Sequence, residues 1–241
     1  MKTLTIKLTS PLQSYGNEAN FNLRTSYPHP SKSAVIGMIA AALGYRRDNT
    51  EQIVKLNNLQ YAVRVEQSGS MMQEFQTVEY NKNSSKTARK LTYRNFLQDA
   101  VFMVAIGADE ETITSIHEAL RKPKFQLYLG RRSNPPAGVL QMHIFDKSPV
   151  EVLEQLDWQA SEWFKKKHKE AKFQTEIFAD ANLLPDKRSI PEKDLIGSLS
   201  SKYRYHKYRF VTSEIVKLNN SYIESKNKSD SESDFDIWKF V

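Results

Sequence analysis

The stretch "DAVFMVAIGADEETITSIHEALRKPKFQLYL", residues 99–129, contains three successive patterns. Its first ten residues are almost all apolar, which is typical of a buried strand. The next segment, residues 109–123, begins with acidic side chains and ends with basic ones, which is the distribution that the helix dipole favours. It also has apolar residues at helical spacing. Those apolar residues are Ile113, Ile116 and Leu120. The last six residues, KFQLYL, predict another strand, so the whole stretch predicts a β-α-β unit.

Another β-α-β pattern precedes this one. Residues 2–10 alternate apolar and polar side chains, as in a half-buried strand. Residues 31–44 are apolar nearly all round, with Ser33 as the expected N-cap and Gly44 as the stop, and they predict a buried helix. Residues 59–67 predict the next strand. Two such units separated by an insertion predict an α+β protein with a ferredoxin-like (RRM-like) domain, a fold that leaves the function open.

The insertion, residues 67–95, is polar and basic, and it predicts two strands joined by a flexible tip. A protruding β-hairpin of this kind is not stable alone and is expected to order against something else. A disordered loop is the alternative, but Phe75, Val78 and Leu91 give the hairpin some apolar footing. We expect the chain to divide into a ferredoxin-like domain at 1–148 that carries the hairpin, a β-rich C-terminal extension at 149–215, and a polar tail at 216–241 that ends in an aromatic cluster.

The composition excludes several kinds of site. The chain has no cysteine, which excludes disulfides, thiolate metal sites and a cysteine nucleophile. Its five histidines show no metal-ligand spacing, and we expect no metal or other cofactor. No run approaches the length that spans a membrane, so we expect a soluble, cytoplasmic protein without a membrane partner. The net charge of +7 fits a polyanionic partner.

A loop with two adjacent arginines points to the same kind of partner. Residues 128–138 read "YLGRRSNPPAG", and glycine and proline mark this stretch as a loop. Gly130 would let the backbone approach a ligand, and Arg131 and Arg132 can form charge-assisted hydrogen bonds with phosphate. A solvated basic loop is the alternative. Residues 201–211, "SKYRYHKYRFV", interleave basic residues with tyrosines, which suits a strand that faces phosphates.

Four stretches in order give the chain a resemblance to a known family. They are "SPLQSYG", "FNLRTSYPHPSKSAVIGMIAAALG", "YRNFLQDAVFMVAI" and "KPKFQLYLGRRSNPPAG". Together they resemble the CasD family, the Cas-five-type subunits of the type I-E CRISPR Cascade. The resemblance covers about residues 1–145 and continues only loosely beyond them. It implies a ferredoxin-like core with a thumb hairpin, in a subunit that holds the 5′ handle of the CRISPR RNA (crRNA) without cutting it, for antiviral defence. The implied partners are crRNA, the CasC backbone subunit, the CasA large subunit and target DNA within the complex.

The first half supplies the first group of candidate RNA-binding residues. Gln13, Ser14 and Tyr15 end the first strand, and Tyr15 either stacks on a base or is half-buried under the loop that follows. Arg24 matches an arginine of the family's pattern.

A further pair of candidates lies at the start of the predicted helix. Lys32 and Ser33 lie at its N-terminus, where an anion is favoured. Simple capping by Ser33 is the alternative reading for that residue, and it leaves Lys32 free to point outward. The remaining candidates come from the hairpin, the glycine loop and the basic strand: Lys86, Arg89, Lys90, Arg131, Arg132, Ser133, Arg204 and Lys207.

Two other functions compete with this interpretation. One is a metal-independent endoribonuclease that cuts the CRISPR repeat, which would need a general base near the 2′-hydroxyl and a cation near the phosphate. His168, among lysines, is the obvious His–Lys cluster, although a solvated basic segment explains it equally well. The other is a stand-alone RNA-binding module. The sequence favours a non-catalytic subunit.

Overall fold

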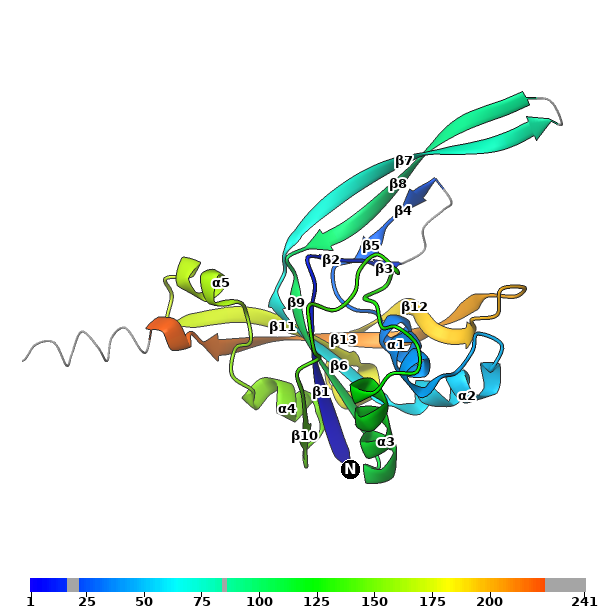
Figure 1. Ribbon diagram of the computed structural model, residues 1–241. Helices are drawn as coiled ribbons and strands as arrows, with labels where there is room; N and C mark the ends of the chain where they lie inside the picture. Colours follow the sequence, from blue (N-terminus) through cyan, green and yellow to red (C-terminus); the bar gives the residue numbers. More distant parts are fainter. Residues whose placement is uncertain (17–21, 84–85, 224–241) are drawn as a thin grey trace, which may run out of the picture.

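The chain is built around one seven-stranded antiparallel sheet (Figure 1). The computed structural model describes residues 1–16, 22–83 and 86–223. In this part of the chain the strands lie side by side in the order β10-β1-β9-β6-β11-β13-β12. Their bounds are β1 (Lys2–Thr9), β6 (Gln60–Gln67), β9 (Val101–Ala108), β10 (Met142–Phe145), β11 (Lys172–Asp180), β12 (Ser189–Ser198) and β13 (Tyr205–Asn219).

The first three strands predicted from the sequence are confirmed, and the fourth was placed wrongly. β1 pairs with β9, and β9 pairs with β6. The stretch KFQLYL, residues 124–129, is not a strand, and β10 pairs with β1 instead. The N–H groups of Lys124 and Phe125 bond to carbonyl groups at the end of the first helix, at 3.0 and 3.1 Å. Leu127 and Leu129 are buried, which produces the alternation that imitates a strand.

Helices cover both faces of the sheet. Helices α1 (Lys32–Leu43) and α3 (Glu110–Arg121) pack over one face, and α4 (Pro149–Gln155) covers the other (Figure 1). Successive strand residues alternate between the two cores, because side chains of a strand point to opposite faces. Helix α2 (Thr50–Lys55) and the 3-10 turn η1 (Leu56–Asn58) follow α1. No helix in the described ranges is long and apolar enough to cross a membrane.

The helix ends show which capping predictions hold. Asp109 caps α3 by accepting a hydrogen bond from the N–H of Thr112 at 2.9 Å. Gly44 ends α1 in the left-handed conformation, with φ of 84°, as expected. The N-cap of α1, however, is Ser31, whose hydroxyl accepts from the N–H of Ala34 at 3.3 Å. The prediction that Ser33 is the cap was therefore wrong, because Ser33 already lies inside the helix.

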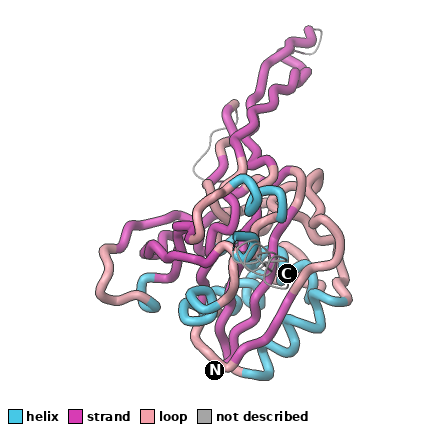
Figure 2. Tube along the Cα trace, turned by 90° about the vertical axis from the view of Figure 1, so that its left-hand side faces the viewer, coloured by secondary structure: helices cyan, strands magenta, loops and turns pink. Residues whose placement is uncertain are grey.

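The predicted hairpin is present, and of the three apolar side chains expected to anchor it, Val78 is half-buried while Phe75 and Leu91 are exposed. Strands β7 (Ser70–Asn83) and β8 (Lys86–Gln98) pair antiparallel and extend away from the rest of the chain in both views (Figures 1 and 2). Residues 84 and 85 lie outside the described residues. Phe75 is 66% exposed and Leu91 is 47% exposed, so these side chains do not attach the hairpin to the core.

Four short strands between residues 12 and 27 hold the base of the hairpin and the segment beside it. β2 (Leu12–Gln13) pairs with β8 antiparallel, and β4 (Leu23–Arg24) pairs with β8 parallel. β3 (Tyr15–Gly16) pairs with β5 (Ser26–Tyr27). The N-terminal loop is thereby attached to the body end of β8.

The C-terminal extension continues the same sheet, since β11 pairs with β6. It also contains α5 (Glu162–Lys167) and the 3-10 turn η2 (Ala181–Leu183). β13 reaches Asn219, so residues 216–219 belong to a strand and not to the predicted tail. Residues 224–241, with their terminal aromatic cluster, lie outside the described residues.

A buried ionic cluster joins the extension to α1. Arg209 binds Asp194 through its Nε at 2.6 Å and Asp180 through its Nη1 at 3.0 Å. Asp180 also accepts from the Nζ of Lys32 at 2.8 Å. All four side chains are buried. The two halves of the chain are therefore held together by charge as well as by strand pairing.

Candidate nucleic-acid interface

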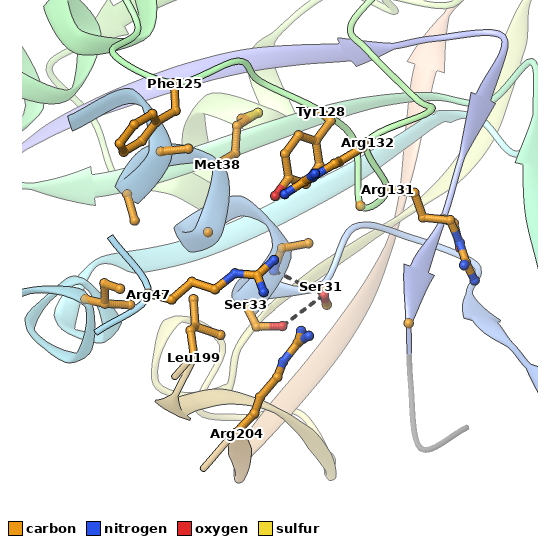
Figure 3. A pocket seen from close by; sticks show the side chains of 18 of the residues that line it. Ser31, Ser33, Met38, Arg47, Phe125, Tyr128, Arg131, Arg132, Leu199 and Arg204 are labelled. Atoms are coloured by element: carbon orange, nitrogen blue, oxygen red, sulfur yellow. Dashed lines mark hydrogen bonds between the residues drawn. The ribbon is translucent and has the colours of Figure 1, made fainter. Parts of the chain in front are cut away.

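An open groove of about 990 Å³ lies where α1, the loop after α3 and the end of the β12–β13 connection meet (Figure 3). None of the described side chains that line it is acidic. Six arginines do line it, and they come from four separate segments of the chain: Arg24, Arg46, Arg47, Arg131, Arg132 and Arg204. Such a surface attracts an anion, because six guanidinium groups gather there and none of the described lining side chains is a carboxylate.

One wall of the groove is a face of α1 made of small side chains. Ala34, Gly37 and Ala41 lie one turn apart on this face. A Cβ atom added to Gly37 would meet nothing within 4 Å, so the helix backbone is open to the groove there. Phe125, which is 44% exposed, and Tyr128 contribute aromatic rings to the lining. A flat apolar ligand group can therefore approach the groove beside its charged groups.

The glycine of the predicted phosphate loop is required by a close backbone approach. Gly130 has φ of 89°, and a Cβ atom there would lie 1.6 Å from the carbonyl oxygen of Ser14. The N–H of Ser14 in turn donates to the carbonyl of Leu129 at 3.2 Å. The glycine thus lets the loop pack against the end of β2. Its role is internal close packing, and it leaves the following arginines at the groove.

Arg131 is held in place by the same contact. Its Nε donates to the hydroxyl of Ser14 at 3.2 Å, and its guanidinium lies 5.2 Å from the centre of the Phe96 ring. In Figure 3, Arg131 points away from Arg47 and Arg204, which extend into the other part of the groove. Burial lowers the pKa of Arg131, and the charges of Arg94 and Arg24 lower it further, while Glu74 raises it.

Arg94 adds a cation that the sequence did not reveal. It lies opposite Arg24 in the parallel β4–β8 pairing. Its Nε is buried and has no hydrogen-bond partner among the described atoms. Its charge acts on Arg131, so Arg94 lies close to the groove, although it is not among the residues that line it.

Six of the predicted RNA-binding residues line the groove: Ser14, Arg24, Ser33, Arg131, Arg132 and Arg204. Ser133 and Lys207 are exposed but do not line it. Arg46 and Arg47 also line the groove and were not predicted. Arg46 and Arg47 come shortly after Gly44, as Arg131 and Arg132 come after Gly130. This repeated pattern of a glycine followed by an arginine pair could have identified them.

Gln13 and Tyr15 were wrong as RNA contacts, because both are buried. Gln13 donates to the carbonyl of Ala100 at 2.7 Å and accepts from the hydroxyl of Tyr15 at 2.6 Å. The Tyr15 ring meets the ring of Phe102 edge-on, with centroids 6.1 Å apart. Burial raises the pKa of Tyr15 well above its usual value. Neither side chain can reach a base.

Lys32 was also wrong as an outward-pointing contact. It is buried beside Asp180, and its backbone N–H donates to Asp194 at 2.7 Å. Burial lowers the pKa of Lys32, against the opposing effect of Asp180. The N-terminus of α1 therefore already holds a carboxylate of the same chain, in the place where a phosphate was expected.

The hairpin candidates lie apart from the groove. Arg89 is exposed and pairs with Glu79 at 2.8 Å, and Lys90 is exposed on the same strand. The side chain of Lys86 lies outside the described residues. An RNA contact by these three residues stays a prediction.

His168, the histidine of the His–Lys cluster considered for an endoribonuclease, does not lie in a solvated basic segment. Its Nδ1 lies 2.9 Å from the carbonyl of Phe164, and its ring packs among Trp158, Phe164 and Phe173. Of the histidines in the described ranges, His206 lines the groove. Burial and Arg204 lower the pKa of His206.

The comparisons with known proteins agree with the resemblance seen in the sequence. Residues 3–212 match the model of the family described as CRISPR-associated protein (Cas_Cas5). The CRISPR system Cascade subunit CasD of Escherichia coli (strain K12) is 30% identical over 149 residues, which are 55% of this chain and just under two thirds, 66%, of that protein.

Two solved structures are also similar over most of their length. A chain of a CRISPR RNA-guided surveillance complex has 25% identity and a TM-score of 0.72, and the match covers 91% of this chain and 92% of that one. A crystal structure described as a Cas protein has 28% identity and a TM-score of 0.67, with 91% and 96% covered. The chain therefore belongs to the Cas5 family of CRISPR-associated proteins.

Proposed function

We propose that the chain is a non-catalytic crRNA-binding subunit of a type I-E CRISPR surveillance complex, and that its groove holds the 5′ handle of the crRNA. The observation that carries the proposal is the groove with six arginines and, among its described lining residues, no acid. Family membership and the similarity to a surveillance-complex chain support it. The CasC and CasA subunits and target DNA are the partners that this role implies.

The geometry of the groove favours single-stranded RNA over a duplex. Arginines surround a face of α1 whose side chains are small apart from Met38, so a strand can place phosphates on the guanidinium groups and bases against the helix. Phe125 and Tyr128 offer rings on which unpaired bases can stack. The paired bases of a duplex would be inaccessible to both.

The strand order supports assigning the first half to the ferredoxin-like class. Along the chain, the sheet strands of the first half come in the order β1, β6, β9 and β10. In the sheet they lie side by side as β10-β1-β9-β6, which is the order fourth, first, third, second, and α1 and α3 lie on one face. In this assignment β7 and β8 are the thumb inserted between the second and third strands. Lys86, Arg89 and Lys90 would contact RNA where it leaves the groove.

The test is retention of RNA by the purified chain. Arg131→Ala combined with Arg132→Ala should weaken binding of a labelled 5′-handle RNA, and the dependence of affinity on salt should become less steep, by about 0.7 per lost phosphate contact. Arg121→Ala with Arg188→Ala removes the same charge from exposed positions outside the groove and serves as the control. Equal losses in the two variants would mean that the groove is not the RNA site.

The endoribonuclease alternative is tested with the same protein. We expect no site-specific cleavage of repeat RNA in EDTA or in magnesium. His206 is the histidine among the described groove residues, and burial favours its neutral form. Cleavage that disappears in His206→Ala would support the enzyme instead.

A further inference from the structure

A second cationic surface lies at the opposite end of the molecule from the arginine groove (Figure 1). It consists of α5 and the loop that follows, where Lys166, Lys167 and Lys169 are exposed and Lys165 is half-buried. The Nζ of Lys166 lies 5.5 Å from the centre of the Tyr222 ring, and Glu162 and Glu170 are close to the patch in sequence. We call this surface the lysine patch.

The loop that carries the patch is fixed from beneath by one asparagine. Asn220 is fully buried, and its amide donates to the carbonyls of Lys165, His168 and Glu170 at 3.1, 2.8 and 3.3 Å. Its own N–H donates to the carbonyl of Ala171 at 2.8 Å. These carbonyl groups are turned inward and the lysine side chains outward, so the patch is a fixed surface and not a loose basic run.

The inner side of α5 is already occupied. Phe164 and His168 lie one turn apart and pack against Trp158 and Phe173. The outer side presents Lys166 and Lys167 with Trp163, which is 54% exposed. Lysines in the last turn of a helix interact favourably with the helix dipole, which explains why Lys165, Lys166 and Lys167 occur there. Lys169 lies beyond the helix, so the dipole does not explain its presence.

We propose that the lysine patch binds double-stranded nucleic acid through its phosphate backbone. Lysines supply point charges, which suit evenly spaced phosphates and read no base sequence. The patch is a helix side and a loop without a groove, so it fits the outside of a duplex and not an extended single strand. A membrane is a poorer fit, because α5 has six residues and its apolar side faces the protein core. The inference does not depend on RNA in the groove.

The experiment measures binding of fluorescein-labelled 24-bp duplexes of one sequence, as DNA and as RNA, to the full-length chain by anisotropy at several salt concentrations. The patch variant is Lys166→Gln/Lys167→Gln/Lys169→Gln. The control, Lys55→Gln/Lys122→Gln/Lys147→Gln, removes the same charge from exposed positions elsewhere. Thermal unfolding checks that both variants stay folded.

We expect the patch variant to bind the preferred duplex at least about tenfold more weakly at 0.1 M salt than the control. Its salt dependence should be less steep by up to about 2.7, or about 0.9 for each lost phosphate contact. The better-bound duplex identifies the type of nucleic acid. Equal affinities of the patch and control variants for both duplexes would overturn the proposal, as would a loss seen only with vesicles of anionic lipid.

Discussion

Replacing Asp194 by alanine is expected to destabilise the whole fold. The carboxylate accepts from Nε and Nη2 of Arg209 at 2.6 and 3.0 Å and from the N–H of Lys32 at 2.7 Å. It is 1% exposed, so water cannot replace it. Removing one partner of a buried ion pair costs about 3–5 kcal/mol, because the other charge stays buried. That loss is a large share of the about 5–15 kcal/mol that holds a domain folded.

The assay is urea unfolding followed by circular dichroism, with the free energy of unfolding taken from the midpoint and slope. Asp194→Asn keeps an acceptor for the N–H of Lys32 but loses the charge, and it should lie between Asp194→Ala and the wild type. Glu79→Ala removes an exposed ion pair with Arg89 and should cost less than about 1 kcal/mol. If Asp194→Ala also stays within about 1 kcal/mol of the wild type, the ionic cluster does not hold the two halves together.

Three further outcomes are expected. Gly130→Ala should reduce RNA retention at least about tenfold, because its Cβ atom would collide with the Ser14 carbonyl. Gly138→Ala is the control: Gly138 has φ of 85°, but a Cβ atom there would meet nothing within 4 Å, so RNA binding should change little. Equal RNA binding by the two variants in a filter-binding assay would contradict the close packing of Gly130 as the cause. Hydrogen exchange should be fast over residues 70–92 in the free chain and slow on assembly, and full protection of the free hairpin would contradict the thumb assignment. Hydrogen bonds from Thr112 lower the pKa of Asp109 below its ordinary value of 3.8. Its contribution to stability is therefore present above that value and is lost as the pH falls through the lower, folded-state pKa. Asp109→Asn should remove this part of the pH dependence in acid unfolding, and an unchanged profile would show that the cap does not titrate as argued.

The elements predicted correctly are those whose signals are local. Helix α3 contains its cap, its apolar spacing and its charge gradient within one segment of sequence. The N-cap of α1 was missed because Ser31 and Ser33 are both acceptable caps, and only the tertiary position decides between them. The strand at residues 124–129 was misassigned because buried leucines alternate there against the core without a neighbouring strand.

The candidate site was predicted only where its chemistry is contiguous. Arg131 and Arg132 follow a glycine in a loop, so their place at the groove could be anticipated. Arg94 comes to lie opposite Arg24 because β4 pairs with β8 in one register, which no local pattern of the sequence contains. Lys32 was misassigned because its partner, Asp180, lies 148 residues further along the chain.

The ionic cluster also sets when the groove can form during synthesis. Helix α1 is synthesised early, but the residues that hold its first turn follow much later: Asp180, Asp194 and Arg209. Asp194 is separated from Lys32 by 162 residues. Contacts this distant in sequence form only after long loops close. Arg204 and His206, which line the groove from the far side, also come late. A nascent chain on the ribosome therefore lacks a complete groove until β13 has emerged.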